Sequence, residues 1–213
     1  MLLLGGTFDP PHLGHLLLAE CARVELGEGR VVFMPAGDPW RKTLPGAVAA
    51  AVPARQVTPA RQRLAMLRLA VRGNAAFAVD DREVRRKGPT YTSDTLAELQ
   101  AEGETDVTLL LGSDAVADMR YWHEPGRILE LARVAAVVKP GGMPVAEAVR
   151  ALAGVVPGAA GRVVEVGSMP PLAISSTLIR ERVAAGLPVR YLVPDAVEQY
   201  IRTRGLYAGG GSP

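Results

Sequence analysis

The chain has 213 residues, with 48% hydrophobic residues, 22% charged residues and a formal net charge of +2. These values are ordinary for a globular protein, and so small a charge excess does not by itself indicate a nucleic-acid-binding protein. The single cysteine, Cys21, excludes an intramolecular disulfide, and no apolar run is long enough to cross a membrane. The opening MLLL lacks the basic segment of a signal peptide and ends at Gly5, so we expect a cytoplasmic protein.

Continuous apolar runs of strand length alternate with helical segments along the chain. Strands are predicted at residues 2–4, 31–34, 77–81, 107–111, 134–138 and 163–166. Helices are predicted at residues 13–26, from Pro59 onward with Thr58 as N-cap, after Ser93 as N-cap, and at residues 144–152, 176–185 and 194–203. Buried strands that alternate with helices are typical of a parallel sheet covered on both faces. The sequence therefore predicts one doubly wound α/β domain over residues 1–207, with a long loop at 36–58 and a disordered tail at 208–213.

The segment GGTFDPPHLGH, residues 5–15, follows the first predicted strand and opens the first helix; we call it the first turn. Ligands of doubly wound folds bind at the carboxyl ends of strands, where glycines and a helix start let a phosphate approach backbone N–H groups. His12 and His15 lie at that helix start and can donate N–H groups to a phosphate. The spacing matches neither the dinucleotide fingerprint nor the P-loop, and the one other histidine, His123, leaves a zinc site short of ligands. Two ordinary surface histidines remain the alternative.

A second candidate phosphate site is ISSTLIR, residues 174–180, which we call the second segment. Ser and Thr at a helix start present hydroxyl and N–H groups to an anion, and Arg180 can donate two hydrogen bonds to phosphate oxygens. A plain N-cap beside a solvated arginine is the commoner meaning of such a string. The residues alone leave both interpretations open.

Two internal segments add candidate ligand contacts. Gly112, Ser113 and Asp114 follow a buried strand, and an aspartate in that position can accept from ribose hydroxyls. Trp122 offers a face on which a flat heterocycle can stack, although a tryptophan of the core or its rim is the alternative. The basic run DREVRRK, residues 81–87, is interrupted by acidic residues, which favours a solvated loop over a nucleic-acid contact.

The first turn and the second segment together resemble the signature of the nucleotidyltransferases that share the HxGH motif. With MPAGDPWRK (34–42), DDREVRRKGPTYTSDTL (80–96) and LLLGSDAVADMRYWHEP (109–125), the chain resembles bacterial nicotinate mononucleotide adenylyltransferases from Leu3 to Tyr207. The resemblance implies a Rossmann-like fold and transfer of AMP from ATP to nicotinate mononucleotide in NAD biosynthesis, which yields deamido-NAD and pyrophosphate. It also implies Mg²⁺ carried by the ATP phosphates, with no metal ligand from the protein and no nucleic-acid or membrane partner. A homo-oligomer stays open, as do nicotinamide mononucleotide or phosphopantetheine as acceptor and a non-catalytic nucleotide-binding module.

The resemblance further assigns roles to individual residues. It makes His12, His15 and Arg180 catalytic through charge and hydrogen-bond donation to the triphosphate. The residues it implies for ATP binding are Gly5, Gly6, Thr7, Phe8, His15, Gly112, Asp114, Ile174, Ser175, Ser176, Thr177 and Arg180. Those it implies for nicotinate mononucleotide are Lys42, Thr92, Trp122 and His123. Trp40 and Arg41 stand where the family commonly has Pro-His, so the role of Arg41 stays open.

Overall fold

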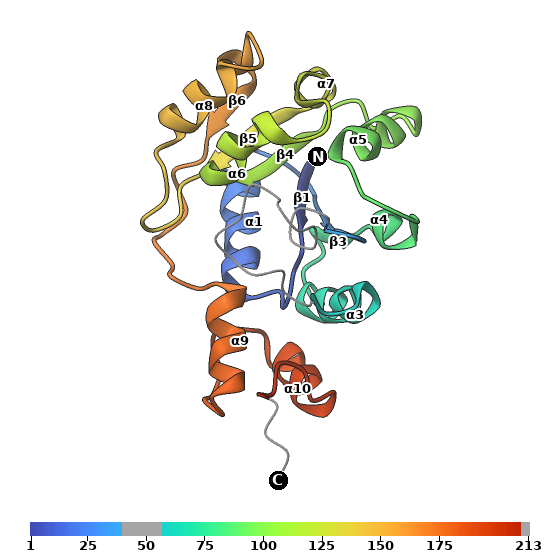
Figure 1. The fold of residues 1–213 in the computed structure, drawn as a ribbon, viewed down its shortest axis with the longest axis vertical. Helices are drawn as coiled ribbons and strands as arrows, with labels where there is room; N and C mark the ends of the chain where they lie inside the picture. Colours follow the sequence, from blue (N-terminus) through green and yellow to red (C-terminus); the bar gives the residue numbers. More distant parts are fainter. Residues whose placement is uncertain (40–56, 210–213) are drawn as a thin grey trace.

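The computed structural model describes residues 1–39 and 57–209, and Figure 1 shows their arrangement. Trp40, Arg41, Lys42 and most of the predicted 36–58 loop lie outside the described residues, as do positions 210–213 of the predicted tail. The described helices are all too short or too polar to span a bilayer.

The centre of the fold is a parallel sheet with the strand order β3-β2-β1-β4-β5-β6. Its strands are β1 (Leu2–Gly6), β2 (Val31–Pro35), β3 (Phe77–Val79), β4 (Thr108–Gly112), β5 (Arg133–Val137) and β6 (Val163–Glu165). Chain order reverses at β1, which pairs with β2 on one side and with β4 on the other. Ligands of doubly wound sheets bind at such a reversal, beyond the carboxyl ends of the two strands. The first turn leaves β1 at this point.

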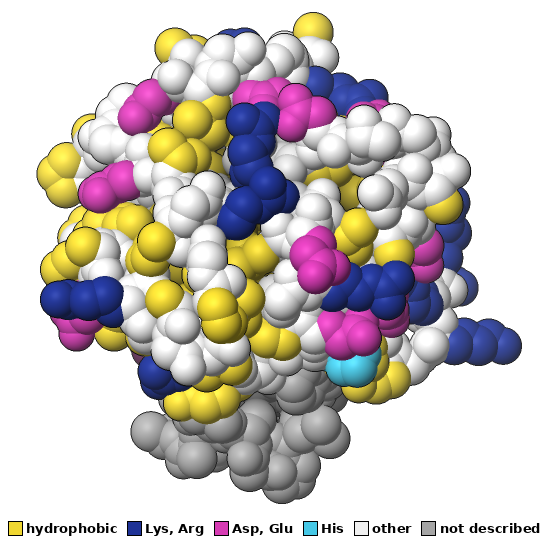
Figure 2. Space-filling model, turned by 90° about the horizontal axis from the view of Figure 1, so that it is seen from above, with side chains coloured by type: hydrophobic (Ala, Val, Ile, Leu, Met, Phe, Trp, Pro, Cys, Tyr) yellow, Lys and Arg dark blue, Asp and Glu magenta, His cyan; other side chains and the backbone are white. Residues whose placement is uncertain are grey.

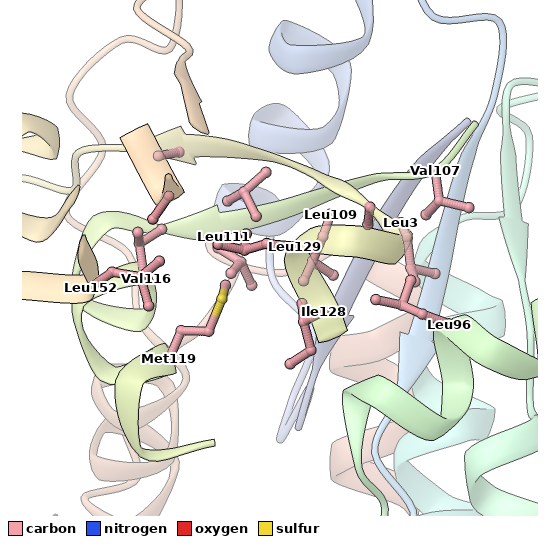
Figure 3. Close-up of a cluster of buried hydrophobic side chains, with 14 of the residues drawn as sticks. Leu3, Leu96, Val107, Leu109, Leu111, Val116, Met119, Ile128, Leu129 and Leu152 are labelled. Atoms are coloured by element: carbon pink, nitrogen blue, oxygen red, sulfur yellow. The ribbon is translucent and has the colours of Figure 1, made fainter. Parts of the chain in front are cut away.

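Helices cover both faces of the sheet, because successive strand residues point to opposite sides. On one face Leu3, Leu109 and Leu111 pack against the helices that follow β3, β4 and β5, as Figure 3 shows. On the other face Leu2 and Leu4 pack against two other helices. The first group is α5 (Thr92–Ala101), α6 (Ser113–Asp118), α7 (Pro125–Leu131) and α8 (Val145–Ala153), and the second is α1 (Leu13–Glu25) and α3 (Ala60–Ala70). The predicted doubly wound fold is confirmed.

The C-terminal helices α9 (Ser176–Ala184) and α10 (Asp195–Thr203) form a separate apolar cluster with α3. Ile179 of α9 and Ile201 of α10 pack there with Met66 of α3. In Figure 1 both helices lie at one end of the molecule, beyond the sheet and next to the start of α1. This cluster therefore holds the start of α9 close to the first turn.

The predicted helix starts at Thr58 and Ser93 are wrong in detail. The residue before α3 is Pro59, not Thr58, and it makes no side-chain cap. The residue before α5 is Tyr91, and Ser93 lies buried inside the first turn of that helix. Both errors have one cause: a hydroxyl residue was expected to cap each helix, whereas packing set its start.

The DREVRRK run also differs from the predicted loop. Residues Arg82–Arg85 form the short helix α4, and the Arg82 guanidinium pairs with Asp80 at 2.7 Å and with Glu102 at 2.8 Å. Four residues are too few for a helical period to show in sequence.

Figure 2 shows one face of the molecule, on which basic and acidic side chains are interspersed. The remaining elements that the sequence did not predict are α6, α7 and the 3₁₀ turns Met119–Tyr121 and Ala159–Arg162.

Candidate active site

The two histidines of the first turn are held against each other at the start of α1. The backbone N–H of His12 donates to Nδ1 of His15 at 3.2 Å, and the two rings stack with their centroids 3.6 Å apart. Because Nδ1 of His15 accepts this hydrogen bond, the neutral ring carries its proton on Nε2. His15 therefore presents an N–H donor from the edge of the ring that faces away from the backbone.

Two glycines make room for the rings of the first turn. A Cβ atom at Gly14 would lie 3.0 Å from Nδ1 of His12, so a side chain there would displace the imidazole. A Cβ atom at Gly6 would lie 3.1 Å from the ring of Phe8, whose own edge packs against His15 with centroids 5.0 Å apart. The glycines at these two positions thus follow from close packing.

His12 is nearly buried, with 6% of its surface exposed. Burial, assisted by the nearby positive charge of Lys139, lowers the pKa of His12 to about 4. His12 is therefore neutral at pH 7 and offers a hydrogen-bond donor rather than a full charge. An incoming anion would raise this pKa, because it favours the protonated ring.

The second segment is bonded directly to the first turn. The Ser176 hydroxyl donates to the carbonyl of Pro10 at 2.8 Å, and the Arg180 guanidinium donates to the carbonyl of Asp9 at 2.8 Å. Ser175 caps α9 by accepting the N–H of Leu178 at 3.1 Å. The structure thus brings together the two predicted phosphate sites, although 166 positions separate Pro10 from Ser176.

The remaining side chains of the second segment lie at the same place. Arg180 also donates to the Thr177 hydroxyl at 3.0 Å, which orients the guanidinium along the first turn of α9. The carbonyl of Ile174 lies 3.7 Å from the position that a Cβ at Gly14 would take. This segment therefore contacts the first turn at both ends.

The described residues leave β1 uncovered near its carboxyl end. Gly5 pairs with Met34 of β2, yet it is exposed, and a Cβ atom built there meets no atom within 4 Å among the described residues. Among these residues, Gly5 therefore marks a hollow beside the first turn, where a bound molecule would touch the sheet.

The end of β4 borders this hollow. The side chain of Lys139, which follows β5, passes 3.3 Å from the Cβ position of Gly112. Asp114 is exposed, and one of its carboxylate oxygens accepts the N–H of Met143 at 3.4 Å. Gly112 and Asp114 are therefore placed at the carboxyl edge, as the sequence predicts.

Thr92, Trp122 and His123 come from two segments that meet at the surface. The His123 ring packs on the Tyr91 ring with centroids 4.4 Å apart, which brings it beside Thr92 at the start of α5. Trp122 is half-buried and packs against the hydrophobic cluster of Figure 3. Trp122 thus serves at least partly as a core residue. Lys42, the fourth residue implied for nicotinate mononucleotide, lies outside the described residues.

One group of possible metal ligands lies on this surface. Ligand atoms of Asp94, His123 and Glu124 are within 4.8 Å of one another, and all three residues are exposed. Glu124 is also 3.5 Å from the Arg127 guanidinium, which competes with a cation for its carboxylate. Exposed acidic side chains are common on protein surfaces, so this group does not by itself indicate a metal site.

A cavity of about 630 Å³ lies along α1 and is lined mainly by apolar side chains. Leu13, Leu16 and Leu17 form one wall, and Ile174 and Phe77 contribute to the others. Such walls suit a triphosphate poorly, because they offer few donors and charges. The first turn, rather than this cavity, is the candidate active site.

The sequence did not identify two residues that complete the site, Lys139 and Tyr207. The Tyr207 hydroxyl donates to the Asp9 carboxylate at 2.7 Å, and burial together with that negative charge raises the pKa of Tyr207. Lys139 could have been noticed, because Lys-Pro-Gly-Gly follows a buried strand much as Gly-Ser-Asp follows β4. Nothing near Tyr207 in the sequence indicates its contact with a residue 198 positions away.

Comparison with known proteins agrees with this geometry. The sequence matches the cytidylyltransferase-like family over residues 3–182. A protein of Thermomicrobium roseum is 42% identical over 96% of this chain and 90% of its own length, and one of Roseiflexus sp. is 44% identical over 96% of each. Both carry the name "probable nicotinate-nucleotide adenylyltransferase". The solved structure of a Plasmodium falciparum nicotinic acid mononucleotide adenylyltransferase complexed with NaAD has a TM-score of 0.74 and 15% identity, covering 97% of this chain and 96% of that one.

The likeness to the solved structure supports the fold, and the sequence identity supports membership in the same protein family as these relatives. Identity above 40% extends over nearly the whole length of these relatives, and the family match includes both the first turn and the second segment. The chain therefore belongs to the cytidylyltransferase-like family and, within it, to the nicotinate-nucleotide adenylyltransferases.

Proposed function

We propose that this protein transfers AMP from ATP to nicotinate mononucleotide, forming deamido-NAD and releasing pyrophosphate. The observation that carries the proposal is the contact between the first turn and the second segment at the carboxyl end of β1. This contact joins the start of α9, with Arg180, to the first turn, which carries His12 and His15 at the start of α1. Such a set of donors and partial positive charges suits a triphosphate.

The ATP phosphates would lie between the starts of α1 and α9. His15 donates from Nε2, His12 adds a neutral N–H donor, and Arg180 and Lys139 supply full positive charges. The backbone of Gly6, Thr7 and Phe8 and the hydroxyls of Ser176 and Thr177 complete the proposed ATP site on this side, which we call the donor side. The nucleoside would occupy the hollow above Gly5, with its ribose near Gly112 and Asp114.

Nicotinate mononucleotide would bind on the other side, at Thr92, Trp122 and His123, which we call the acceptor side. Its phosphate is already an anion, so it can attack the α-phosphorus of ATP without a general base. The protein then contributes mainly alignment of the two substrates and stabilisation of the developing charge on the pyrophosphate leaving group. No residue of the described site needs to accept a proton in this reaction.

Nucleotidyltransferases generally use a divalent metal with ATP, and we propose Mg²⁺ for this one. Asp9, the carboxylate of the first turn, is bonded to the Tyr207 hydroxyl at 2.7 Å and to the Thr58 N–H at 3.4 Å. A donor set made of cations, hydroxyls and N–H groups fits an ion held by phosphate oxygens and water rather than by a protein cage. Such an ion would neutralise charge on the triphosphate.

The test is release of pyrophosphate from ATP, with nicotinate mononucleotide, nicotinamide mononucleotide and phosphopantetheine offered in separate reactions. We expect the fastest release, with deamido-NAD as the product, in the first reaction. A faster reaction with either of the other two acceptors would support adenylyl transfer but would show that nicotinate mononucleotide is not the preferred acceptor. No release with any acceptor would favour a nucleotide-binding protein without catalytic activity.

A further inference from the structure

Arg63 is the most deeply buried charged side chain among the described residues, and it is not itself one of the proposed ligand-binding residues. Arg63 lies in α3, and 1% of its surface is exposed. Burying an arginine is unfavourable unless its N–H groups find acceptors. All of its described hydrogen bonds go to backbone carbonyls.

Three separate segments supply these acceptors. Nη1 donates to the carbonyl of Thr7 in the first turn at 2.7 Å. Nη2 donates to Ala36 at 2.7 Å and to Gly37 at 3.0 Å, just beyond β2. Nε donates to the carbonyl of Thr58 at 2.8 Å, just before α3. A single planar group thus ties together the carboxyl ends of β1 and β2 and the start of α3.

The segment held by Arg63 beyond β2 leads to the acceptor side. A Cβ atom at Gly37 would collide with the carbonyl of Glu83 in α4, so the backbone of residue 37 lies directly against that helix. The carbonyl of Asp38 accepts the Thr90 hydroxyl at 3.2 Å, two residues before Thr92. The contacts therefore run from Thr7 on the donor side, through Arg63, to the start of α5 on the acceptor side.

From these contacts we infer that Arg63 is a positioning residue, which fixes the spacing between the donor side and the acceptor side. The inference rests on the proposed adenylyl transfer, since it concerns alignment of the two substrates of that reaction. In-line attack requires the acceptor phosphate and the α-phosphorus to meet at a set distance and angle, and a shift of about 1 Å can slow such a reaction about 100-fold. Arg63 touches neither substrate and acts through Thr7 and Gly37.

The decisive variant is Arg63→Lys, which keeps the charge but loses the planar set of donors. An ammonium group donates from one point, so it cannot reach all three segments at once. Arg68→Lys is the matched control, because Arg68 lies on the same helix with 58% of its side chain exposed. Both variants are compared with the wild-type chain for thermal unfolding, for ATP binding by calorimetry and for deamido-NAD formation well below the unfolding temperature.

We expect R63K to lower kcat at least about tenfold while its affinity for ATP alone stays within about threefold of the wild-type value. R68K should match the wild type in both measurements. A kcat for R63K within about twofold of the control, or a loss confined to ATP affinity, would overturn the inference. Absence of deamido-NAD formation by the wild type itself would instead refute the proposed function.

A second variant covers the case in which R63K does not fold. Arg63→Ala opens a cavity of the shape of the side chain, into which methylguanidinium ion fits. Refolding and assay in its presence should restore activity, whereas tetramethylammonium at the same concentration should not. Equal activity with the two cations would contradict a role for the planar donor group.

Discussion

The donor side and the acceptor side of the proposed site are built in different ways. On the donor side, Thr7, Asp9 and Pro10 are bonded to residues 49 to 198 positions away in the chain. Asp9 is 2% and His12 is 6% exposed. On the acceptor side, His123 is exposed, and its described ring contact is with Tyr91.

The difference indicates which of the two substrates binds to groups that are already held in place. The groups proposed to bind the triphosphate are held in place before ATP arrives, so little ordering is needed on binding. The acceptor groups lie on a surface that the second substrate would itself help to cover. Substitutions on the donor side should therefore reduce the rate of transfer, whereas those on the acceptor side should mainly weaken binding of one substrate.

The largest effect is expected for His15→Ala. The variant removes a donor aimed at developing charge, and loss of one such group lowers kcat about 100- to 1,000-fold. Pyrophosphate release measures the change. His123→Ala is the comparison, assayed at saturating nicotinate mononucleotide, because His123 lies on the acceptor side and its exposed side chain is proposed to bind that substrate; kcat should stay within about threefold even where the KM for nicotinate mononucleotide rises. Transfer by H15A at a rate close to that of H123A would remove the main support for a preformed donor side.

Gly5→Val should lower activity about 100-fold without lowering stability. Valine suits a strand better than glycine, and no atom of the described residues lies within 4 Å of the Cβ position at Gly5. That side chain would fill the hollow proposed for the nucleoside, so the KM for ATP should rise. Gly126→Ala, at another glycine with open space in α7, should stay active. A fully active G5V enzyme would place the nucleoside elsewhere.

Trp122→Ala tests the acceptor side and should have a smaller effect. Loss of a stacking face costs about 1–3 kcal/mol, which should raise the KM for nicotinate mononucleotide about 5- to 140-fold. The KM for ATP should be unchanged. Trp122→Phe, which keeps an aromatic ring, should recover most of the affinity. If W122A loses stability but binds both substrates normally, Trp122 serves only the core cluster that it contacts.

The smallest effect concerns pH and His12. The folded pKa of about 4 lies below the ordinary 6.5, so the unfolded chain binds more protons between these values and stability falls as pH is lowered through them. From pH 7.5 to 5.5 this contributes a loss of about 1 kcal/mol. Urea unfolding of His12→Gln should show a pH dependence weaker by this amount, while His123→Gln should keep it. An identical dependence in H12Q and the wild type would contradict a buried, neutral His12.

Much of the donor side could be predicted from the sequence, because local patterns encode it. The glycines and histidines of the first turn and the hydroxyls of the second segment lie at strand and helix ends that composition already marks. The six strands were predicted because each contains a short run of apolar residues. In the fold the four inner strands, β1, β2, β4 and β5, are largely buried, whereas β3 and β6 at the edges are not. The contact between the two segments was implied by the family resemblance, not by spacing.

The parts that could not be predicted depend on tertiary contacts. Arg63 reads as one of several arginines on a helix, and only the fold shows that it reaches carbonyls of three segments. The Thr58 hydroxyl was expected to cap α3. In the structure Pro59 precedes the helix, and the contact that Thr58 makes with α3 is through its backbone carbonyl, which accepts a hydrogen bond from Arg63. Tyr207 likewise gains its partner only when the chain's end returns to its beginning. Partners so distant in sequence leave no periodic or compositional signal.

The hydrogen bond between Tyr207 and Asp9 also affects the order of events during synthesis. Synthesis of the chain reaches Tyr207 198 positions after Asp9. The sheet strands all precede Tyr207, but the Asp9 carboxylate gains this hydrogen bond only after Tyr207 has left the ribosome. A nascent chain that ends before Tyr207 would therefore contain both histidines of the first turn while the Asp9 carboxylate still lacks this partner.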